Sequence, residues 1–413
     1  MAASLPSAAV LGARAFAALE GLARFSDEPG KLTRLYLSPA HRQAAEWTKG
    51  AMEVAGLTAF IDAAGAGRRE GPVPGGPSVM IGSHIDTVKD GGRFDGNLGV
   101  VAGILAAQAL RDAGIVLPFA LEVVAFGDEE NVRFPTHLST SGALAGDYDP
   151  AWLEARDADG VRLADALVAF GGDPGGIAGL ARKPGSVKAY LEVHIEQGPV
   201  LEVENEAVGI VTAINAQRRA RVRVTGEAGH AGTVPMALRK DALTAGAEMA
   251  LALEGIAAGH EQAVGTVGVF QVEPGATNVV PGAVSFTVDI RSPRDETVAA
   301  MEAIVRERFA AIAARRGVGL DITTYAKASA VPMDPTLQEA LSAGIARMGV
   351  NPTPRRLPSG AGHDAMAMAA LCPAAMLFVR NEHGSHNPLE AMAIDDFMAA
   401  ATVLAQWVAD NAG

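Results

Sequence analysis

The sequence predicts an α/β protein whose main domain contains a mostly parallel sheet and carries a smaller, inserted α+β domain. Two patterns predict this fold class. In the first and last parts of the chain, short apolar segments alternate with longer helical segments, as in parallel sheets. Between residues 213 and 328, the strands instead alternate apolar and polar residues. We therefore expect a main domain over residues 1–212 and 329–413, and an inserted domain over 213–328.

The strands of the main domain are expected where β-branched and aromatic residues gather. Phe119–Phe126 (FALEVVAF) has this composition, whereas Asn97–Leu110 is rich in Ala and Leu and predicts a buried helix. The expected strands are Ser78–Ile85, Phe119–Phe126, Ala189–Ile195 and Ala375–Val379, and the expected helices are Asn97–Leu110 and Glu390–Asp410.

The inserted domain has the order β-α-β-β-α-β, which is the ferredoxin-like pattern. In its first strand, Val222 and Val224 lie on one face while Arg221 and Arg223 lie on the other. The solvated face of such a two-layer domain suggests a role in dimerisation. The expected strands are Arg219–Thr225, Val264–Val272, Ala283–Arg291 and Leu320–Tyr325, and the expected helices are Pro235–Ile256 and Arg294–Arg315.

The composition argues against several classes of protein. Among 413 residues, 34 are basic and 47 are acidic, so the net charge of −13 does not suit a nucleic-acid binder or a polybasic membrane surface. The single cysteine, Cys372, permits no internal disulfide and is expected to be a buried thiol. The N-terminal residues lack a basic region before their apolar stretch, so no signal peptide is expected. We therefore expect a cytoplasmic protein without membrane or nucleic-acid partners.

Residues of the metal-ligand type follow four of the expected strands. Because ligands bind beyond the carboxyl ends of parallel strands, these distant residues are expected to meet at one edge of the sheet. The candidates are His84 and Asp86, then Asp95 in the following Gly-rich turn, then Asp128, Glu129 and Glu130, then His194 and Glu196, and finally His383 and His386.

This set of candidates favours a metal site with nitrogen and oxygen ligands. Such ligands without thiolate suit Zn, Mn, Co or Ni. Five ligands exceed the needs of one tetrahedral catalytic site, but they suit two metals about 3.5–4 Å apart that share a carboxylate. Of the adjacent Glu129 and Glu130, one then binds metal and the other acts as a base. Each motif alone is weak evidence, since HxD pairs and EE pairs are often solvated or form structural ion pairs. Their joint placement at strand ends carries the prediction.

A series of motifs extends this pattern over nearly the whole chain, roughly residues 10 to 410. In order, the motifs are GSHIDTVKDGGRFDGNLGV, GDEEN, LEVHIEQGPVLE, GHAGTVPM, NVVPG, DIRS, SGAGHDA and GSHNPLE. Together they resemble the dimetal amidohydrolases that include N-carbamoyl-L-amino-acid hydrolases, allantoate amidohydrolases and β-ureidopropionases, within the aminoacylase and carboxypeptidase metallopeptidase clan.

The resemblance implies two divalent metal ions and a role for each ligand. His84 and His194 bind one metal, Glu130 and His386 bind the other, and Asp95 bridges the two. Glu129 is then the general base and acid. Asp86 is the expected partner that orients the imidazole of His84. His383, three residues before His386, is expected to be a local loop residue.

The resemblance also assigns substrate contacts to the inserted domain, which would act as a lid and form a homodimer. His230 would hydrogen-bond the developing oxyanion. Arg291 would grip a substrate carboxylate through its planar fork, with Asn278 beside it. Without the resemblance, Arg291 would be taken for a solvated strand end. Gln217, Gly360 and His363 match substrate-lining positions.

The implied activity is hydrolysis of a linear amide or ureido C–N bond in a small molecule that bears a carboxylate, such as an N-carbamoyl-L-amino acid or allantoate. Three alternatives remain open: an N-acyl amino acid hydrolase or peptidase of the same clan, a non-catalytic metal-binding homologue, and an α/β protein whose clusters are structural ion pairs. The loops that carry Asn131, Val132, Glu382 and His383 depart from the family's usual residues, so an atypical substrate is also possible.

Overall fold

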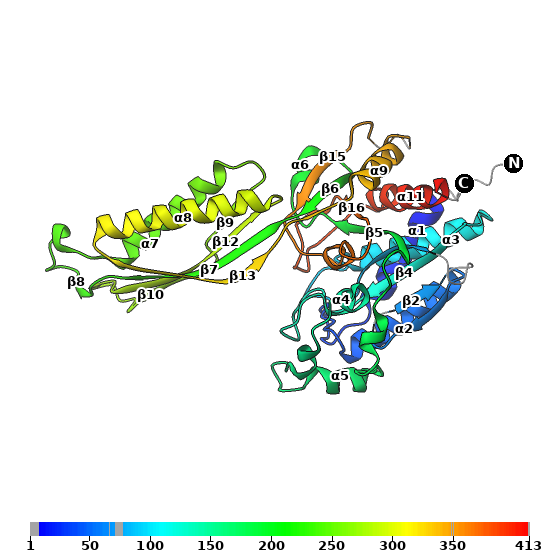
Figure 1. The fold of residues 1–413 in the computed structure, drawn as a ribbon, viewed down its shortest axis with the longest axis horizontal. Coiled ribbons are helices and arrows are strands. Elements are labelled where there is room, and N and C mark those ends of the chain that lie inside the picture. The colour runs from blue at the N-terminus through cyan, green and yellow to red at the C-terminus, as the bar shows by residue number, and fades with distance from the viewer. Residues whose placement is uncertain (1–7, 66, 71–76, 348, 350, 412–413) are drawn as a thin grey trace. The chain divides into compact units, whose positions relative to one another are not determined.

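A computed structural model describes residues 8–65, 67–70, 77–347, 349 and 351–411 (Figure 1). The chain divides into two compact units. The first unit combines Met1–Thr212, Met333–Leu357 and Ala361–Gly413, and the second combines Ala213–Pro332 with Pro358–Gly360. The N-terminal segment on which the expectation of no signal peptide was based includes residues 1–7. These residues lie outside the described part of the chain.

The first unit is a mixed α/β structure (Figure 1). Its helices are α1 (Ala8–Ala23), α2 (Pro39–Val54), α3 (Asn97–Asp112), α4 (Ser139–Ala145), α5 (Leu163–Phe170), α6 (Val200–Glu204), α9 (Pro335–Arg347), α10 (Ala365–Met368) and α11 (Ile394–Asp410), with 3₁₀ turns at Pro150–Glu154 and Ile177–Leu180. Its strands are β1 (Thr58–Ile61), β2 (Gly67–Glu70), β3 (Ser78–His84), β4 (Ala120–Phe126), β5 (Val187–Ile195), β6 (Val208–Ile214), β15 (Arg355–Ser359) and β16 (Ala374–Val379).

Four adjacent parallel strands, in the order β4-β3-β5-β16, form the centre of the sheet. Antiparallel strands extend it on both sides, β2 and β1 beyond β4, and β6 beyond β16. Every residue of β3, β4 and β16 is buried, as expected for strands covered on both faces. The register pairs His84 with Phe126 and Phe378 with His194, so the carboxyl ends of these strands meet at one edge.

The first unit differs from the sequence prediction in several places. The last helix begins at Ile394 and not at Glu390, because the preceding Ala391 pairs with Glu382 in an isolated β-bridge. The prediction also lacks several elements, which are the helices α1, α2, α4, α5, α6, α9 and α10 and the strands β1, β2, β6 and β15. The start of α2 nevertheless has a local signal: Ser38 accepts a hydrogen bond from the main-chain N–H of His41, and Pro39 follows it.

The second unit has two layers, with α7 and α8 packed on one face of an antiparallel sheet (Figure 1). The sheet has the order β10-β12-β7-β13, with β9 also paired to β12, and the chain follows the β-α-β-β-α-β order. Its elements are β7 (Ala216–Thr225), β8 (Gly229–His230), a 3₁₀ turn (Met236–Leu238), α7 (Ala242–Ala258), β9 (Val264–Thr266), β10 (Phe270–Glu273), β11 (Val279–Val280), β12 (Ala283–Ser292), α8 (Asp295–Arg316), β13 (Gly319–Ala328) and β14 (Val331–Pro332).

Two predicted elements in this unit differ most from the structure. The helix predicted from Pro235 begins at Ala242, because the side chain of Asp241 caps it by accepting from the N–H of Thr244. The strand predicted over Val264–Val272 is two strands, since the main chain leaves the ladder at residues 267–269. No helix among the described residues combines the length and apolar composition that a bilayer span requires.

Candidate metal centre

Three ligand-type side chains converge at the carboxyl edge of the parallel strands. His84 ends β3, His194 lies near the end of β5, and Asp95 lies two residues before α3. The three residues are at most 4% exposed. Oδ1 of Asp95 lies 3.2 Å from Nε2 of His194 and 3.6 Å from Nε2 of His84. These three residues therefore form a buried group with their ligand atoms directed at one another.

The main chain fixes which nitrogen of each imidazole faces this group. Nδ1 of His84 lies 3.0 Å from the carbonyl oxygen of Asp86, and Nδ1 of His194 lies 2.9 Å from that of Ile195. Only an N–H can bond to a carbonyl, so both Nδ1 atoms carry a proton. Each Nε2 then presents a lone pair, or a second proton, to Asp95. A cation at this position satisfies both imidazoles and the carboxylate, which is the arrangement that metal-binding histidines commonly have.

A second group shares the same aspartate. Nε2 of His386 lies 3.5 Å from Oδ2 of Asp95 and 3.4 Å from Oε2 of Glu130. The two oxygens of Asp95 therefore face different partners, Oδ1 the His84 and His194 pair and Oδ2 the His386 side. Such a carboxylate can serve two cations at once.

Glu129 lies beside both groups without belonging to the Asp95 set. Its Oε2 is 3.7 Å from Nε2 of His84, and its side chain is 11% exposed. The carboxylate of Asp86 accepts the main-chain N–H groups of Glu129 and Glu130, at 3.3 and 3.2 Å. The expected contact of the Asp86 carboxylate with His84 is longer, at 3.6 Å from Nδ1. The shortest contact of Asp86 with that imidazole is through its main-chain oxygen.

Two residues that the sequence analysis did not single out hold the Asp95 loop. Oε1 of Glu390 accepts the main-chain N–H groups of Phe94 and Asp95, at 2.8 and 3.2 Å. Nε2 of Gln197 donates to Oδ2 of Asp95 at 3.0 Å. Both residues lie inside the motif strings HIEQG and SHNPLE. Those strings are the only signal that could have identified them, because their partners lie far away along the sequence.

Burial and charge set the ionisation of the group. Burial, partly offset by His84, raises the pKa of Glu129 well above its usual value, and burial with the charge of Asp95 raises that of Glu130 to about 8. Burial opposes the charge of Asp95, but bonds and charges from His194 and His84 outweigh it and hold its pKa well below its usual range. Burial therefore disfavours the charged forms of Glu129 and Glu130, whereas the two histidines favour the charged form of Asp95.

The donor set fits divalent metal ions. Within the described part of the chain, Oε1 of Glu130 is buried without a hydrogen-bond partner. Imidazole nitrogen and carboxylate oxygen, without thiolate, suit Zn, Mn, Co or Ni. The groups that could hold an ion among the described residues include His84–Asp95–His194 and Asp95–Glu130–His386.

The loops around the centre hold the remaining residues singled out in the first unit. His363 is buried with its ring edge against the His194 ring, at a centroid distance of 4.4 Å. His383 is exposed, and its carbonyl oxygen accepts from Nδ2 of Asn387. Asn131 is exposed and donates to the main-chain oxygen of Glu129 at 2.6 Å. The exposed residues also include Val132 and Glu382.

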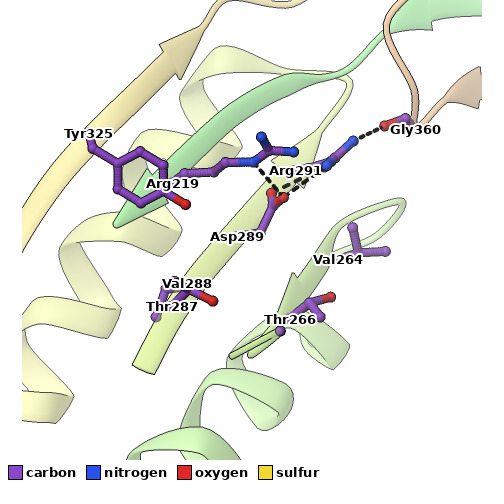
Figure 2. Close-up of a pocket in the computed structure, with 10 residues that line it drawn as sticks. Arg219, Val264, Thr266, Thr287, Val288, Asp289, Arg291, Tyr325 and Gly360 are labelled. Carbon is purple, nitrogen blue, oxygen red and sulfur yellow. Dashed lines mark hydrogen bonds and ion pairs between the residues drawn. The ribbon is translucent and has the colours of Figure 1, made fainter. Parts of the chain in front are cut away.

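A pocket of about 430 Å³ in the second unit surrounds Arg291 (Figure 2). Its Nε and Nη2 donate to Asp289 at 3.1 and 2.8 Å, and its Nη1 donates to the carbonyl oxygen of Gly360 at 2.5 Å. Nε of Arg219 also donates to Asp289, at 3.0 Å. Gln217, the register partner of Arg291, lies 3.3 Å from Oδ2 of Asp289 through its Nε2. Two guanidinium groups around one carboxylate leave the pocket with an excess of positive charge.

His230 lies in a separate part of the second unit. It forms β8, which pairs with β11, and its Nδ1 accepts the N–H of Gly232 at 3.0 Å. A neutral His230 therefore carries its proton on Nε2, which can act as a hydrogen-bond donor. The carbonyl oxygen of Asn278 accepts the N–H of Ala231 at 2.9 Å, so the two residues predicted to contact the substrate, His230 and Asn278, lie close together.

A parallel α/β sheet with a histidine and carboxylate centre at its carboxyl edge defines a class, the metal-dependent α/β enzymes. The chain belongs to peptidase family M20/M25/M40, which matches residues 80–410. It is thus a metal-dependent hydrolase that acts on C–N bonds.

Individual relatives cover almost the whole chain. The chain is 39% identical to an N-carbamoyl-L-amino acid amidohydrolase of Geobacillus stearothermophilus over 96% of its own length and 97% of the relative's. It is 38% identical to an allantoate deiminase of Arabidopsis thaliana over 97% of its length and 82% of the relative's. A solved hydantoinase/carbamoylase family amidase of Burkholderia ambifaria superposes with a TM-score of 0.90 at 38% identity, covering 100% and 99% of the two chains. The predicted family and type of activity are confirmed.

Proposed function

We propose that this chain hydrolyses the ureido C–N bond of an N-carbamoyl-L-amino acid or of allantoate, with two divalent cations as cofactors. His84 and His194 would hold one cation, Glu130 and His386 the other, and Asp95 both. The proposal rests mainly on the way the two carboxylate oxygens of Asp95 face different partners. Oδ1 faces the imidazoles of His84 and His194, and Oδ2 faces that of His386.

The chain's own residues have distinct tasks in this reaction. Divalent cations bound here would supply Lewis-acid chemistry, polarising the scissile carbonyl and lowering the pKa of an attacking water. Oε2 of Glu129 takes the proton of that water and returns it to the leaving nitrogen. Burial favours this role, because it raises the pKa of Glu129 and a carboxylate with a raised pKa is a stronger base. Asp86 holds Glu129 in place through its main-chain N–H.

The carboxylate of the substrate is assigned to Arg291. Its fork is already fixed in a bidentate contact by Asp289, and Arg219 adds positive charge to the same pocket (Figure 2). A preorganised guanidinium suits a planar carboxylate. Gln217 and Gly360, which surround Arg291, share this task. The two relatives named above support carboxylated ureido compounds as the substrate class.

The second unit also supports a homodimer, in which it acts as a lid. His230 and Asn278 lie near the start of β12, where Thr225 pairs with Ala283, whereas Arg291 lies near its other end. The eight residue-to-residue steps from Ala283 to Arg291, at about 3.3 Å each, span roughly 26 Å. One small substrate cannot contact both ends, so we assign His230 and Asn278 to the substrate of the partner copy. His363 remains a substrate contact in this proposal, and the single cysteine supports a cytoplasmic location.

Release of ammonia from Mn²⁺-loaded protein tests the proposal. The panel contains allantoate, several N-carbamoyl-L-amino acids and β-ureidopropionate, and amine release is followed for N-acetyl amino acids and dipeptides. Turnover of ureido substrates alone supports the proposal. Turnover of acyl or peptide substrates alone would refute the ureido assignment while keeping the metal chemistry.

The variant Glu129→Gln separates the base from the ligands. We expect it to bind Mn²⁺ as tightly as the natural chain while losing about 10²–10⁴-fold in turnover, the usual contribution of a general base. The matched variant Glu130→Gln should instead lose Mn²⁺ affinity. Full turnover in Glu129→Gln would show that the base assignment is wrong.

A further inference from the structure

Arg34 is a fully buried arginine that none of the roles above uses. It lies in the loop before α2 and is the largest of the fully buried side chains. Its guanidinium donates four hydrogen bonds, all to neutral acceptors. Nη1 donates to the carbonyl oxygens of Leu22 and Phe25 at 2.8 and 3.1 Å, Nε to that of Ile85 at 2.5 Å, and Nη2 to Oδ1 of Asn97 at 2.6 Å.

Two of these acceptors lie within two residues of candidate metal ligands. Ile85 lies between His84 and Asp86, and Asn97 lies two residues after Asp95. One rigid fork therefore connects the loop after β3 with the first residue of α3. The contacts with Leu22 and Phe25 attach the same fork to the end of α1 and the loop that follows it.

The main chain of Arg34 strengthens the connection. Its N–H donates to Oγ1 of Thr87 at 2.9 Å, and its carbonyl oxygen accepts the N–H of Thr87 at 3.0 Å. Position 34 is therefore held against the loop after β3 by both its main chain and its side chain. A change at Arg34 would be transmitted to His84 and Asp95.

Burying the charged guanidinium of Arg34 costs free energy, which suggests that this residue has a specific role. Removing a cation from water costs several kcal/mol unless it is paired. Among the described residues no carboxylate lies within 4.0 Å of this guanidinium, although Asp86 and Asp27 act on it at longer range. Burial lowers the pKa of Arg34 to about 10, partly offset by those charges, so it stays protonated at neutral pH. Neutral acceptors in four directions match the planar guanidinium but not a lysine ammonium.

We propose that Arg34 is a positioning residue that fixes the separation of His84 and Asp95 and thereby sets the affinity of the centre for its cation. The fork acts through Ile85 and Asn97, and its shape matters more than its charge. This inference rests on the proposed metal centre.

Calorimetric titration of the metal-free, full-length protein with Mn²⁺ tests the inference without depending on activity. We expect Arg34→Lys, which keeps the charge but loses the fork, to raise the Kd for Mn²⁺ about 10–100-fold, the usual effect of losing a partner that orients metal ligands. Asn97→Ala removes only one contact of the fork and should weaken binding in the same direction by a smaller factor.

A matched control separates positioning from general stability. Arg182 makes a bidentate contact with Glu122 at 2.8 and 2.9 Å in the same unit. Arg182→Lys should lower the melting temperature and leave the Kd for Mn²⁺ within about twofold, because its contacts do not reach the ligand loops. If Arg34→Lys does not fold, Asn97→Ala decides the question.

The possible outcomes distinguish the two proposals. A natural chain that binds no Mn²⁺ would refute the proposed metal centre itself. A natural chain that binds Mn²⁺ while Arg34→Lys and Asn97→Ala bind it equally well would overturn the role of Arg34 alone. Equal weakening in Arg182→Lys would also overturn it, since the effect would then reflect stability.

Discussion

A methyl group added at Gly96 should separate the fold from the metal centre. Gly96 caps α3 with φ 68° and ψ −53°, a backbone conformation that costs other residues about 1–3 kcal/mol. A Cβ atom here would also lie 2.5 Å from Cγ of His84, about 0.9 Å short of the 3.4 Å at which ordinary contacts begin. The imidazole must move by that amount, whereas metal–ligand distances tolerate only about 0.2 Å. We therefore expect Gly96→Ala to lose at least tenfold in Mn²⁺ affinity.

Gly114, just after α3, offers a matched control for this change. Its φ of 66° is similar, but a Cβ added there would meet nothing within 4 Å. Both variants should lose stability in urea unfolding, by about 1–3 kcal/mol each. Only Gly96→Ala should lose affinity in a calorimetric Mn²⁺ titration. Equal Mn²⁺ affinities of Gly96→Ala and Gly114→Ala would refute the argument that the space beside His84 must stay empty.

Three further predictions concern other parts of the chain. Glu390→Gln keeps an oxygen for the N–H groups of Phe94 and Asp95 and should retain Mn²⁺ affinity within a few-fold, whereas Glu390→Ala leaves both groups unpaired at a cost of about 1–3 kcal/mol each, measurable by urea unfolding. Arg291→Ala should raise the KM of carboxylated substrates and leave decarboxylated analogues unaffected; an equal effect on both would contradict the carboxylate role. Burial raises the pKa of Cys372 to about 12, so its thiol should stay unmodified by a disulfide reagent at pH 8 until urea is added; rapid labelling of the native protein would contradict this.

The sequence predicted the elements that are buried on both faces better than it predicted their boundaries. Continuous apolar runs identified β4 and β16 within one residue, because such runs have few alternatives in an α/β chain. The last helix begins four residues after its predicted start, because Glu390 and Ala391 make contacts with other segments of the chain. Those contacts depend on the tertiary fold and leave no mark on local periodicity.

The convergence of His84 and His194 could be predicted, because each lies at the carboxyl end of a parallel strand. His84 and His194 needed only the rule that ligands gather at the carboxyl edge of parallel strands. No comparable rule identifies Arg34 or Glu390 from the sequence. Arg34 lies in a loop, and its partners at Ile85 and Asn97 are more than 50 residues away. Only the folded chain reveals which loops a buried guanidinium connects.

Backbone strain gathers in the loops that carry the ligands. Seven of the described residues other than glycine with positive φ lie there: Asp90, Asp128, Asn131, Leu138, Gln197, His383 and His386. Such conformations cost about 1–3 kcal/mol each and persist where surrounding contacts enforce them. The same loops gather carboxylates whose pKa burial raises, as at Glu130. Both the backbone strain and the buried carboxylates lie where a cation would bind. A bound cation would offset their costs, because it would neutralise the carboxylates and hold the loops in place. The centre is thus locally destabilised without a cation, and cation binding would relieve this destabilisation. We therefore expect contacts that hold these loops, such as those of Arg34, to affect metal affinity more than overall stability.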